Sequence, residues 1–266
     1  MNIQHDFHIH TVYSSDASQL ATVENYVNVA KEAGLKKIGF AEHFWDGKIQ
    51  GAFDFYKSLT YEHFLPVKEE VKRLKNDDLK LYFGCEVEYS PALCSPAITE
   101  ETAEKFEFIL VPHSHSHETM PKEYYDNPQK HTDFIVEAYN NIINSNVSKY
   151  ITAMAHPFGL VRCPYPRSVL IDMVSDDTFK RMFDKTAQKD IAIEINTSSV
   201  FKNGITRENI YESDLLRIFE TAKGCGCKFI FGSDAHHTDH IKRREYADSI
   251  SEYLGLKEEN IAAIAR

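Results

Sequence analysis

The chain contains 266 residues, of which 42% are hydrophobic and 26% are charged, and this composition excludes an intrinsically disordered protein. Its formal net charge of -10 at pH 7 disfavours the broad cationic surface that binds nucleic acid, so we expect no nucleic-acid partner. The length allows a large core, and we expect a single domain that spans residues 1–266.

The cysteines and the apolar runs bear on the cellular compartment. The five cysteines include no CxxC pair of the kind that binds structural zinc, which is typical of reduced thiols that serve packing. No basic region followed by an apolar stretch opens the chain, and no apolar run approaches the roughly 18 residues of a membrane span. We therefore expect a cytoplasmic protein that does not enter a membrane.

Short apolar runs alternate with amphipathic stretches along the chain. The runs with strand character are residues 3–8, 37–41, 79–87, 106–111, 150–155, 191–195 and 228–231. The stretches with helical periodicity are residues 22–33, 61–75, 132–144, 168–188, 211–223, 241–254 and 257–265. This alternation predicts a parallel sheet in an α/β fold, and closure into a barrel is the simplest way to bury such a sheet.

Long irregular segments rich in aromatic residues follow four of the predicted strands. They cover residues 44–60, 89–99, 118–130 and 157–167. In α/β barrels, the loops that leave the strands build the substrate pocket. We therefore take Trp45 and Tyr56 as candidate substrate-binding residues. The alternative for any one aromatic residue is that it only covers the mouth of the barrel.

His8 and His10 stand two residues apart at the end of the first predicted strand. On a strand, this spacing turns both imidazoles to one face, where they can bind one metal ion. Further histidines and carboxylates follow other predicted strands, namely His43, Glu86, the cluster His113–His117, His156, Asp234 and His236. Because the exits of parallel strands meet at one end of a barrel, the pattern predicts a multinuclear metallohydrolase.

Six short motifs lie at or near the ends of these strands. They are Asp-Phe-His-Ile-His-Thr at 6–11, Ala-Glu-His at 41–43, Gly-Cys-Glu-Val-Glu at 84–88, Ala-His-Pro at 155–157, Glu-Ile-Asn-Thr-Ser at 194–198 and Gly-Ser-Asp-Ala-His at 232–236. In this order they make the chain resemble the PHP (polymerase and histidinol phosphatase) superfamily of metal-dependent hydrolases, and within it the histidinol-phosphatase-like branch. The resemblance implies a distorted, TIM-like (β/α)7 barrel, which agrees with the seven apolar runs.

The resemblance also implies two to three divalent ions, zinc, manganese or iron. A first ion would be held by His8, His10, Glu86 and Asp234, a second by Glu86, His156 and one histidine of the 113–117 cluster, and a third by Asp16, His43 and His236. The family commonly has histidine at the place of Asp16, and a carboxylate there would favour manganese or iron over zinc or lower the occupancy. The alternative for Asp16 is a helix cap or a turn.

The histidine cluster leaves the choice of ligand open. In an extended segment, alternation would place His113, His115 and His117 on one face, although only one of them need bind a metal. The Pro-x-Ser-His form favours His115, with His113 as the alternative and His117 in the pocket. His113 or His117, whichever is not a ligand, is the candidate acid that protonates the leaving alkoxide, and Asp234 and His236 are further candidates for proton handling.

The expected chemistry is hydrolysis of a phosphate ester. Closely spaced divalent ions polarise a phosphoryl oxygen and convert a bound water into the hydroxide that attacks phosphorus. This explains why the chain needs neither a serine nucleophile motif nor a glycine-rich phosphate loop. Arg162 is the candidate clamp for the phosphate, followed by Arg167 and Lys202, and the alternative for Arg167 is an ordinary surface arginine.

We therefore expect a phosphomonoesterase that resembles histidinol-phosphate phosphatase and acts on a small phosphorylated substrate. A nucleotide or a sugar phosphate is the alternative substrate, because the metal ligands would contact only the phosphate. A metal-stabilised scaffold without activity is a different class, which the nearly complete ligand set disfavours. The sequence leaves open the native metal, the substrate and the oligomeric state.

Overall fold

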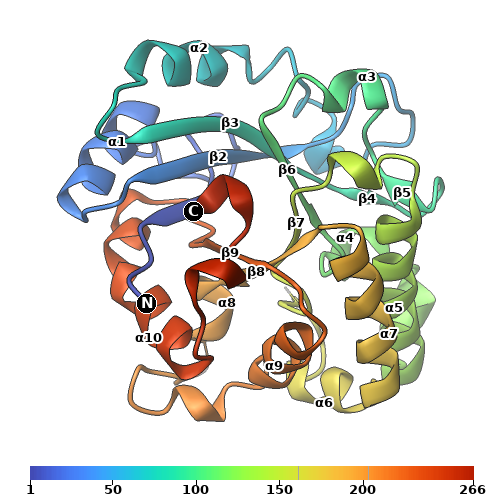
Figure 1. Cartoon of the computed structure of the whole chain (residues 1–266). Helices are drawn as coiled ribbons and strands as arrows, with labels where there is room; N and C mark the ends of the chain where they lie inside the picture. Colours follow the sequence, from blue (N-terminus) through green and yellow to red (C-terminus); the bar gives the residue numbers. More distant parts are fainter. Residues whose placement is uncertain (161, 203) are drawn as a thin grey trace.

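The computed structural model describes residues 1–160, 162–202 and 204–266. Seven parallel strands form one sheet in the order β1-β2-β3-β6-β7-β8-β9, so each strand lies beside the next long strand in the chain (Figure 1). The strands are β1 (His5–Ile9), β2 (Lys37–Phe44), β3 (Lys80–Val87), β6 (Phe108–Pro112), β7 (Ala153–Ala155), β8 (Ala192–Asn196) and β9 (Phe229–Gly232). Each of the seven predicted strands is therefore confirmed, with ends that shift by a few residues.

The first and last strands meet and nearly close the sheet into a barrel. Ile9 and Ala235 form a parallel bridge, in which the His10 amide donates to the Ala235 carbonyl (2.9 Å) and the Ala235 amide donates to the His8 carbonyl (3.1 Å). The buried carboxylate of Asp6 also joins the two strands, because one of its oxygens accepts from the amides of His8 (3.1 Å) and Ser233 (3.0 Å). The expected TIM-like barrel is confirmed.

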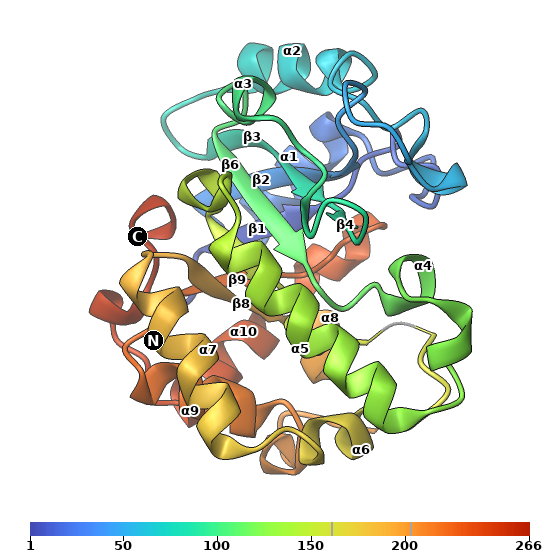
Figure 2. The same cartoon turned by 90° about the vertical axis from the view of Figure 1, so that its right-hand side faces the viewer.

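Helices cover the outside of the sheet (Figures 1 and 2). The covering helices are α1 (Val23–Glu32), α2 (Leu65–Leu74), α3 (Glu100–Ala103), α5 (Pro128–Asn144), α6 (Arg167–Asp172), α7 (Asp176–Gln188), α9 (Leu216–Gly224) and α10 (Arg244–Tyr253). The short helices α4 (Ser116–Thr119) and α8 (Thr197–Val200) follow the ends of β6 and β8. A small hairpin of β4 (Tyr89–Ser90) and β5 (Ser95–Pro96) lies outside the main sheet. Across the described residues, every helix is too short or too polar to cross a membrane.

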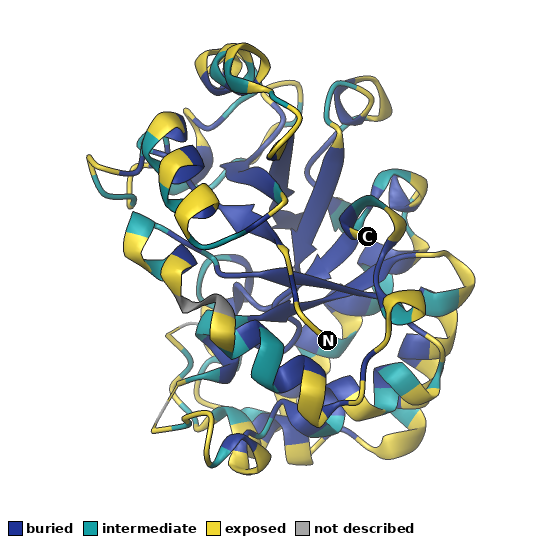
Figure 3. Cartoon of the chain, turned by 60° about the vertical axis from the view of Figure 1, so that its left-hand side comes forward, coloured by how far each residue is buried: buried dark blue, intermediate teal, exposed yellow. Residues whose placement is uncertain are grey.

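The strands of the barrel are buried along most of their length, whereas the helices alternate between buried and exposed positions (Figure 3). Inside the barrel, the ring of Phe108 lies directly against the backbone of two neighbouring strands. A Cβ atom on Gly39 would stand 2.6 Å from this ring, and one on Gly84 would stand 2.3 Å from it. Only glycine leaves room for the phenyl ring at these two positions. The ring of Phe108 therefore fills the space that side chains at positions 39 and 84 would otherwise occupy.

Two predicted helices differ from the structure. Residues 168–188 form two helices, because α6 ends at Asp172 and Ser175 caps the start of α7 by accepting a hydrogen bond from the Thr178 amide. Residues 257–265 contain only two 3₁₀ turns, Glu258–Asn260 and Ala263–Ala265. The intervening Ile261 is held in an extended conformation by a parallel bridge to Phe229, which prevents a continuous helix there.

Candidate metal centre

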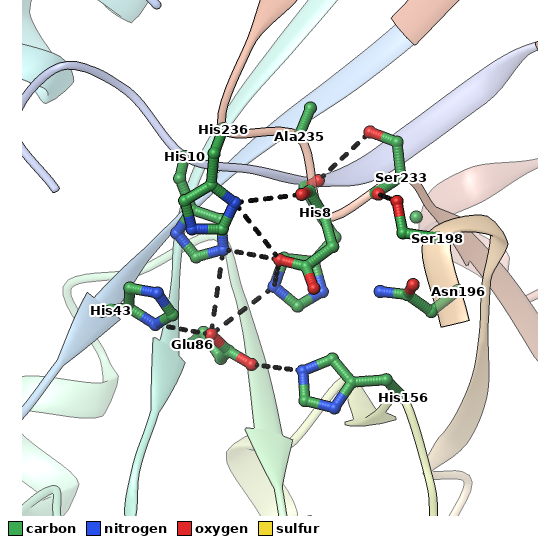
Figure 4. A network of polar contacts seen from close by, with 12 residues as sticks. His8, His10, His43, Glu86, His156, Asn196, Ser198, Ser233, Ala235 and His236 are labelled. Carbon is green, nitrogen blue, oxygen red and sulfur yellow. Dashed lines mark hydrogen bonds and ion pairs between the residues drawn. The ribbon is translucent and has the colours of Figure 1, made fainter. Parts of the chain in front are cut away.

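Histidines and carboxylates gather at the carboxyl ends of the strands, where Figure 4 shows most of them converging around Glu86. His8 lies on β1 and His10 just beyond it, His43 and Glu86 lie at the ends of β2 and β3, and His115, His156, Asp234 and His236 follow β6, β7 and β9. Of these residues, His8, His10, Glu86 and His156 are almost completely buried. The parallel barrel thus brings six separate segments to one place.

Four of these side chains bring their ligand atoms close together. His8 Nε2 lies 3.5 Å from Glu86 Oε2 and 3.7 Å from Asp234 Oδ1. His10 Nε2 lies 3.8 Å and 3.3 Å from the same two oxygens. Ligand atoms at about 2.0–2.2 Å from a tetrahedral ion stand roughly 3.3–3.6 Å apart, so this spacing suits one metal ion.

The other oxygen of Glu86 faces a second pair of histidines. Glu86 Oε1 lies 2.7 Å from His156 Nε2 and 3.9 Å from His115 Nε2, and the two imidazoles are stacked with their centroids 5.1 Å apart. The carboxylate of Glu86 therefore stands between two groups of ligand atoms. It has the position that a residue bridging two ions requires.

Asp16, His43 and His236 form a third group nearer the solvent. Asp16 Oδ2 lies 3.5 Å from His43 Nε2 and 3.3 Å from His236 Nε2. The ring of His10 lies against the rings of both His43 and His236, with centroid distances of 4.2 Å and 4.3 Å. The side chain of Asp16 is 44% exposed, so this group is open to the pocket, whereas His8, His10 and Glu86 of the first group are buried.

Carboxylates and hydroxyls behind the histidines fix the orientation of their rings. Glu194 Oε1 lies 2.7 Å from His8 Nδ1, Glu88 Oε2 lies 2.8 Å from His115 Nδ1, and Ser114 Oγ lies 2.8 Å from His156 Nδ1. Each contact occupies Nδ1 and leaves Nε2 free to face the cluster. Such partners set the tautomer of a histidine and make it a better metal ligand.

Several polar atoms inside the cluster have no hydrogen-bond partner. Among the described residues, they are His8 Nε2 and both ring nitrogens of His10. An unsatisfied buried polar atom is costly, and several converging ones indicate a missing partner. Imidazole nitrogens and carboxylate oxygens are the ligands that zinc, manganese and iron accept, so the residues present fit such ions.

The charges in the cluster suit a cation. Burial opposes the charge of Glu86, but the neighbouring His8, His156 and His43 hold the pKa of this carboxyl well below its usual range. Burial likewise opposes the charge of Asp234, and His8 and His10 hold its pKa well below the ordinary value. Burial lowers the pKa of His10 well below its ordinary value, and the positive charges of His43 and His236 add to this effect. At neutral pH the cluster therefore offers anionic oxygens and the neutral ring of His10. Burial opposes the charge of His8, but Glu194 and Glu86 raise its pKa well above the ordinary value, so an ion bound there would displace a proton.

Two of the candidate ligands have unusual backbone conformations. His156 has a φ of 26° and Asp234 a φ of 56°, both in the left-handed region that is rare for residues other than glycine. The carboxylate of Glu194 accepts a hydrogen bond from the His156 amide (2.5 Å) and so helps to hold this conformation. Backbone strain of this kind occurs where a side chain must be held in a specific direction.

A pocket of about 290 Å³ opens above the cluster. Its walls are formed by Asp16, His43, Phe55, Tyr56, His115, His117, Glu118, Arg162, Asp234 and His236. The pocket lining thus contains the third group of ligand atoms together with Arg162, the candidate phosphate clamp, and aromatic side chains. A pocket at the lower end of the roughly 300–1,000 Å³ that is usual for ligand sites suits a small metabolite.

Three of the expected roles do not agree with the structure. His113 Nδ1 donates to the Ile135 carbonyl (3.0 Å) and its Nε2 accepts from the Phe158 amide (3.1 Å), so no ring nitrogen is left for a metal or a substrate. Trp45 is buried at 2% exposure and donates to the Ile49 carbonyl, away from the pocket lining.

Arg167 is the third case. Its guanidinium forms a bidentate ion pair with Asp214 and donates to the Ser199 carbonyl (2.9 Å). Lys202, the remaining candidate cation, lines a different cavity beside α8. Of the cations considered for the phosphate, only Arg162 lines the pocket above the cluster.

Glu42 and Glu118 are site residues that the sequence did not reveal. Glu42 is completely buried and accepts from the Thr11 amide (2.9 Å) and the Ser14 hydroxyl (2.6 Å), which fixes the loop that carries Asp16. Its position in Ala-Glu-His, beside His43, was the available signal. Glu118 projects into the pocket from α4, and nothing in its sequence context distinguished it from a surface glutamate.

Comparisons with known proteins agree with this geometry. The PHP domain family matches residues 6–198. The structure is similar to that of histidinol phosphate phosphatase from Lactococcus lactis, solved with zinc, L-histidinol and phosphate, with 17% identity, a TM-score of 0.67 and coverage of 96% of this chain and 94% of that chain. It is also similar to a candidate histidinol phosphatase from Listeria monocytogenes, with 16% identity, a TM-score of 0.63 and coverage of 90% and 97%. No curated protein matches the chain in sequence.

Proposed function

Because the chain belongs to the PHP-domain family, we propose that this metal-dependent hydrolase is a phosphomonoesterase of the histidinol-phosphate phosphatase type. One observation carries the proposal. The free nitrogens of His8 and His10 lie 3.3–3.8 Å from the oxygens of Glu86 and Asp234, and Asp234 lines a pocket that also contains Arg162. The likeness to histidinol phosphatases supports the choice of substrate class.

The three groups of side chains would hold two to three divalent ions. We assign His8, His10, Glu86 and Asp234 to one ion, Glu86, His115 and His156 to a second, and Asp16, His43 and His236 to a third. Bound divalent ions supply Lewis acidity and lower the pKa of a water molecule towards neutrality. The remaining steps depend on side chains that bind and orient the phosphate ester and protonate the leaving alkoxide.

Arg162 and His117 would act on the phosphoryl group and the leaving alcohol. Arg162 lines the pocket, and its backbone carbonyl accepts a hydrogen bond from the Tyr125 hydroxyl. Burial and the charge of His115 lower the pKa of His117 to about 4 in the empty pocket. An adjacent phosphate dianion would raise this pKa, so His117 would become protonated on substrate binding and could then donate to the alkoxide.

Tyr56 would shape the pocket and support a ligand histidine. Its hydroxyl donates to Glu88 Oε2 (2.6 Å), the same oxygen that lies against His115 Nδ1, while its ring forms part of the pocket wall. Asp234 and His236 also face the pocket, but as metal ligands they would be poor free bases. We therefore place any proton transfer through them second to His117.

Metal analysis combined with a panel of phosphate esters tests the proposal. The chelated protein is reloaded with zinc, manganese or iron, and hydrolysis of 4-nitrophenyl phosphate is measured for each metal. Histidinol phosphate, nucleoside monophosphates and sugar phosphates then rank the substrates. Bound metal without hydrolysis of any ester would favour a scaffold, and a nucleotide or sugar phosphate as the best substrate would replace the histidinol-phosphate assignment.

The assignment of Arg162 makes a specific prediction. Arg162→Ala should lower kcat/KM by about 10- to 100-fold for every phosphate ester, because charge-assisted hydrogen bonds of roughly 1.5–3 kcal/mol are lost at the group that all esters share. Metal content should not change. Arg181→Ala, which removes an exposed arginine of α7, is the control and should retain parent kinetics. Unchanged kinetics in Arg162→Ala would contradict the clamp.

A further inference from the structure

The candidate phosphate clamp, Arg162, lines the pocket without a side-chain partner that would hold it there. Among the contacts of the described residues, its guanidinium forms neither an ion pair nor a hydrogen bond, whereas the guanidinium of Arg167 is fixed by Asp214. A flexible side chain loses rotamer freedom when it binds an anion, and binding costs less when the backbone below it is already in place. The placement of Arg162 therefore depends on contacts of its backbone.

The backbone at Arg162 has a strained conformation. Its φ of 51° lies in the left-handed region, which persists in residues other than glycine only where neighbouring contacts hold it. Residues 163–166 read Cys-Pro-Tyr-Pro, and each proline restricts its own φ and the conformation of the residue before it. The segment after Arg162 is therefore stiff, so contacts at Arg162 and Cys163 are enough to direct the arginine.

Two side chains make these contacts. The Tyr125 hydroxyl donates to the Arg162 carbonyl. Cys163 Sγ lies 4.0 Å from His131 Nδ1, which is within hydrogen-bond reach of a sulfur atom. The rings of Tyr125 and His131 are themselves stacked, with centroids 6.0 Å apart and an angle of 26° between their planes. One pair of stacked rings therefore holds both the arginine backbone and the residue that follows it.

His131 also connects this segment to another part of the pocket wall. It is completely buried in the first turn of α5, and its Nε2 lies 2.8 Å from Ser116 Oγ at the start of α4, the helix that carries His117. Burial lowers the pKa of His131, so the ring is neutral at pH 7 and can accept from the thiol while it donates to the hydroxyl. One buried ring thus links the segment of the proposed clamp to the helix of the proposed acid.

We propose that Tyr125 and His131 are positioning residues, which hold Arg162 in the conformation that presents its guanidinium to the phosphoryl group. Neither residue lines the pocket, so both would act through Arg162 and would not touch the substrate. Their effect on hydrolysis rests on the proposed phosphomonoesterase function, whereas their anchoring of the Arg162 segment is independent of it.

A double-mutant cycle tests whether Tyr125 acts through Arg162. Tyr125→Phe removes one hydrogen bond and should lower kcat/KM for 4-nitrophenyl phosphate by about 2- to 10-fold, with metal content unchanged. In the Arg162→Ala background the same change should have no further effect, because no guanidinium is left to position. A loss of equal size in both backgrounds would overturn the positioning role, since Tyr125 would then act on the fold or on another group.

Tyr124→Phe is the matched control. Tyr124 ends the 3₁₀ turn just before Tyr125, its ring lies 5.2 Å from Lys130 Nζ, and its hydroxyl takes part in none of the hydrogen bonds among the described residues. This variant should keep parent kinetics. His131→Phe retains a ring for stacking but removes both polar contacts, and it should lower kcat/KM at least as much as Tyr125→Phe. Parent kinetics in His131→Phe would remove His131 from the proposal.

Alkylation of the cysteines measures the anchoring without metal or activity. The chelated protein is treated with iodoacetamide, and the modification of each cysteine is followed by mass spectrometry of its peptide. Exposed Cys94 is the internal reference, and buried Cys85 and Cys227 report unfolding of the whole chain. Tyr125→Phe should raise the rate at Cys163 by about 2- to 10-fold relative to Cys94, the usual effect of one lost hydrogen bond on a local opening.

The alkylation rates separate this inference from the proposed function. A faster reaction of Cys163 alone in Tyr125→Phe, with Tyr124→Phe like the parent, supports the anchoring even if no ester is hydrolysed, in which case only the phosphatase proposal fails. An unchanged rate at Cys163 contradicts the anchoring whatever the enzyme hydrolyses. Faster reaction of Cys85 and Cys227 as well would also contradict it, because Tyr125 would then stabilise the whole fold.

Discussion

Glu86 is the side chain on which the candidate metal centre converges. One of its oxygens lies 2.7 Å from His156 Nε2, and the other lies 2.8 Å from His43 Nδ1 and 3.5 Å from His8 Nε2. No other described carboxylate of the cluster faces histidines from three different strand ends. Its loss should therefore affect more than one ion.

Replacement of Glu86 by alanine should remove more than one equivalent of metal and abolish turnover, because the proposed bridge between two ions is lost. Asp16→Ala is the comparison, since this residue belongs only to the outer group and should empty one site. Metal content is measured by elemental analysis after gel filtration. Full metal retention in Glu86→Ala would refute the bridge, and unchanged metal and rate in Asp16→Ala would make Asp16 a turn residue.

The low pKa of His113 predicts how the stability of the fold changes in acid. Burial lowers the pKa of this imidazole to about 3, whereas the unfolded chain should titrate near the ordinary value of 6.5. Between these values the unfolded state binds the proton and the folded state does not, so stability falls as the pH decreases from about 6.5 towards 3. The slope for one such group is at most about 1.4 kcal/mol per pH unit.

His113→Gln should flatten this part of the stability profile. A glutamine amide can still donate to the Ile135 carbonyl and accept from the Phe158 amide, but it does not titrate. Urea unfolding of the chelated parent and variant at pH 7 and pH 5 checks the difference. Some slope should remain, because burial also lowers the pKa of His5 to about 3. Identical slopes for parent and variant would contradict the assignment.

At the scale of the elements, strands β1, β8 and β9 meet at one crowded point. A Cβ atom on Gly232 would stand 2.1 Å from Glu194 Oε1 and 2.5 Å from His8 Cβ. The same carboxylate orients His8 through Nδ1 (2.7 Å) and accepts from the His156 amide (2.5 Å). The close packing of three strands therefore determines where two candidate ligands point.

Gly232→Ala should displace Glu194 and weaken metal binding by about 10- to 100-fold, the usual effect of losing a partner behind a ligand. Overpacking should also lower the free energy of unfolding by roughly 1–3 kcal/mol. Gly224→Ala, where an added Cβ meets nothing within 4 Å, is the matched control and should leave both quantities almost unchanged. Equal metal affinity in the two variants would show that Glu194 does not position the ligands.

The strands were predictable from the sequence because each is a short apolar run that ends at a polar motif. The boundaries inside helical stretches were harder to predict. The break at Ser175 is a single capping residue within an amphipathic pattern, and the bridge of Ile261 to Phe229 is a contact between distant segments. The hairpin of β4 and β5 has strands of two residues each, too short to show any periodicity.

The candidate ligands were predictable in part, and the residues around them less so. Strand-exit position and residue type marked His8, His10 and Glu86. The choice within the 113–117 cluster required the structure, because the strand ends at Pro112 and the chain then enters α4, which separates the three imidazoles. The pairing of Arg167 with Asp214 joins residues 47 positions apart, which no local pattern reveals.

At the scale of the whole molecule, Asp6 links the two ends of the sheet. Asp6→Ala should leave the buried amides of His8 and Ser233 without this acceptor and lower the free energy of unfolding by about 2–6 kcal/mol, at roughly 1–3 kcal/mol for each amide. Asp6→Asn keeps a carbonyl oxygen and should lose less than half as much. Urea unfolding of the chelated proteins gives the comparison, and equal losses would show that the acceptor is unimportant.

The junction of β1 and β9 also lies directly beneath the candidate metal centre. His8 and His10 come from one side of this junction and Asp234 and His236 from the other, so an ion bound between them would connect the first strand of the barrel to the last. Opening the barrel at this edge would then require breaking coordination bonds as well as two backbone hydrogen bonds. The rate at which the barrel opens would then be limited by dissociation of the ion. Slow release of metal would make the protein resistant to proteolysis for a long time.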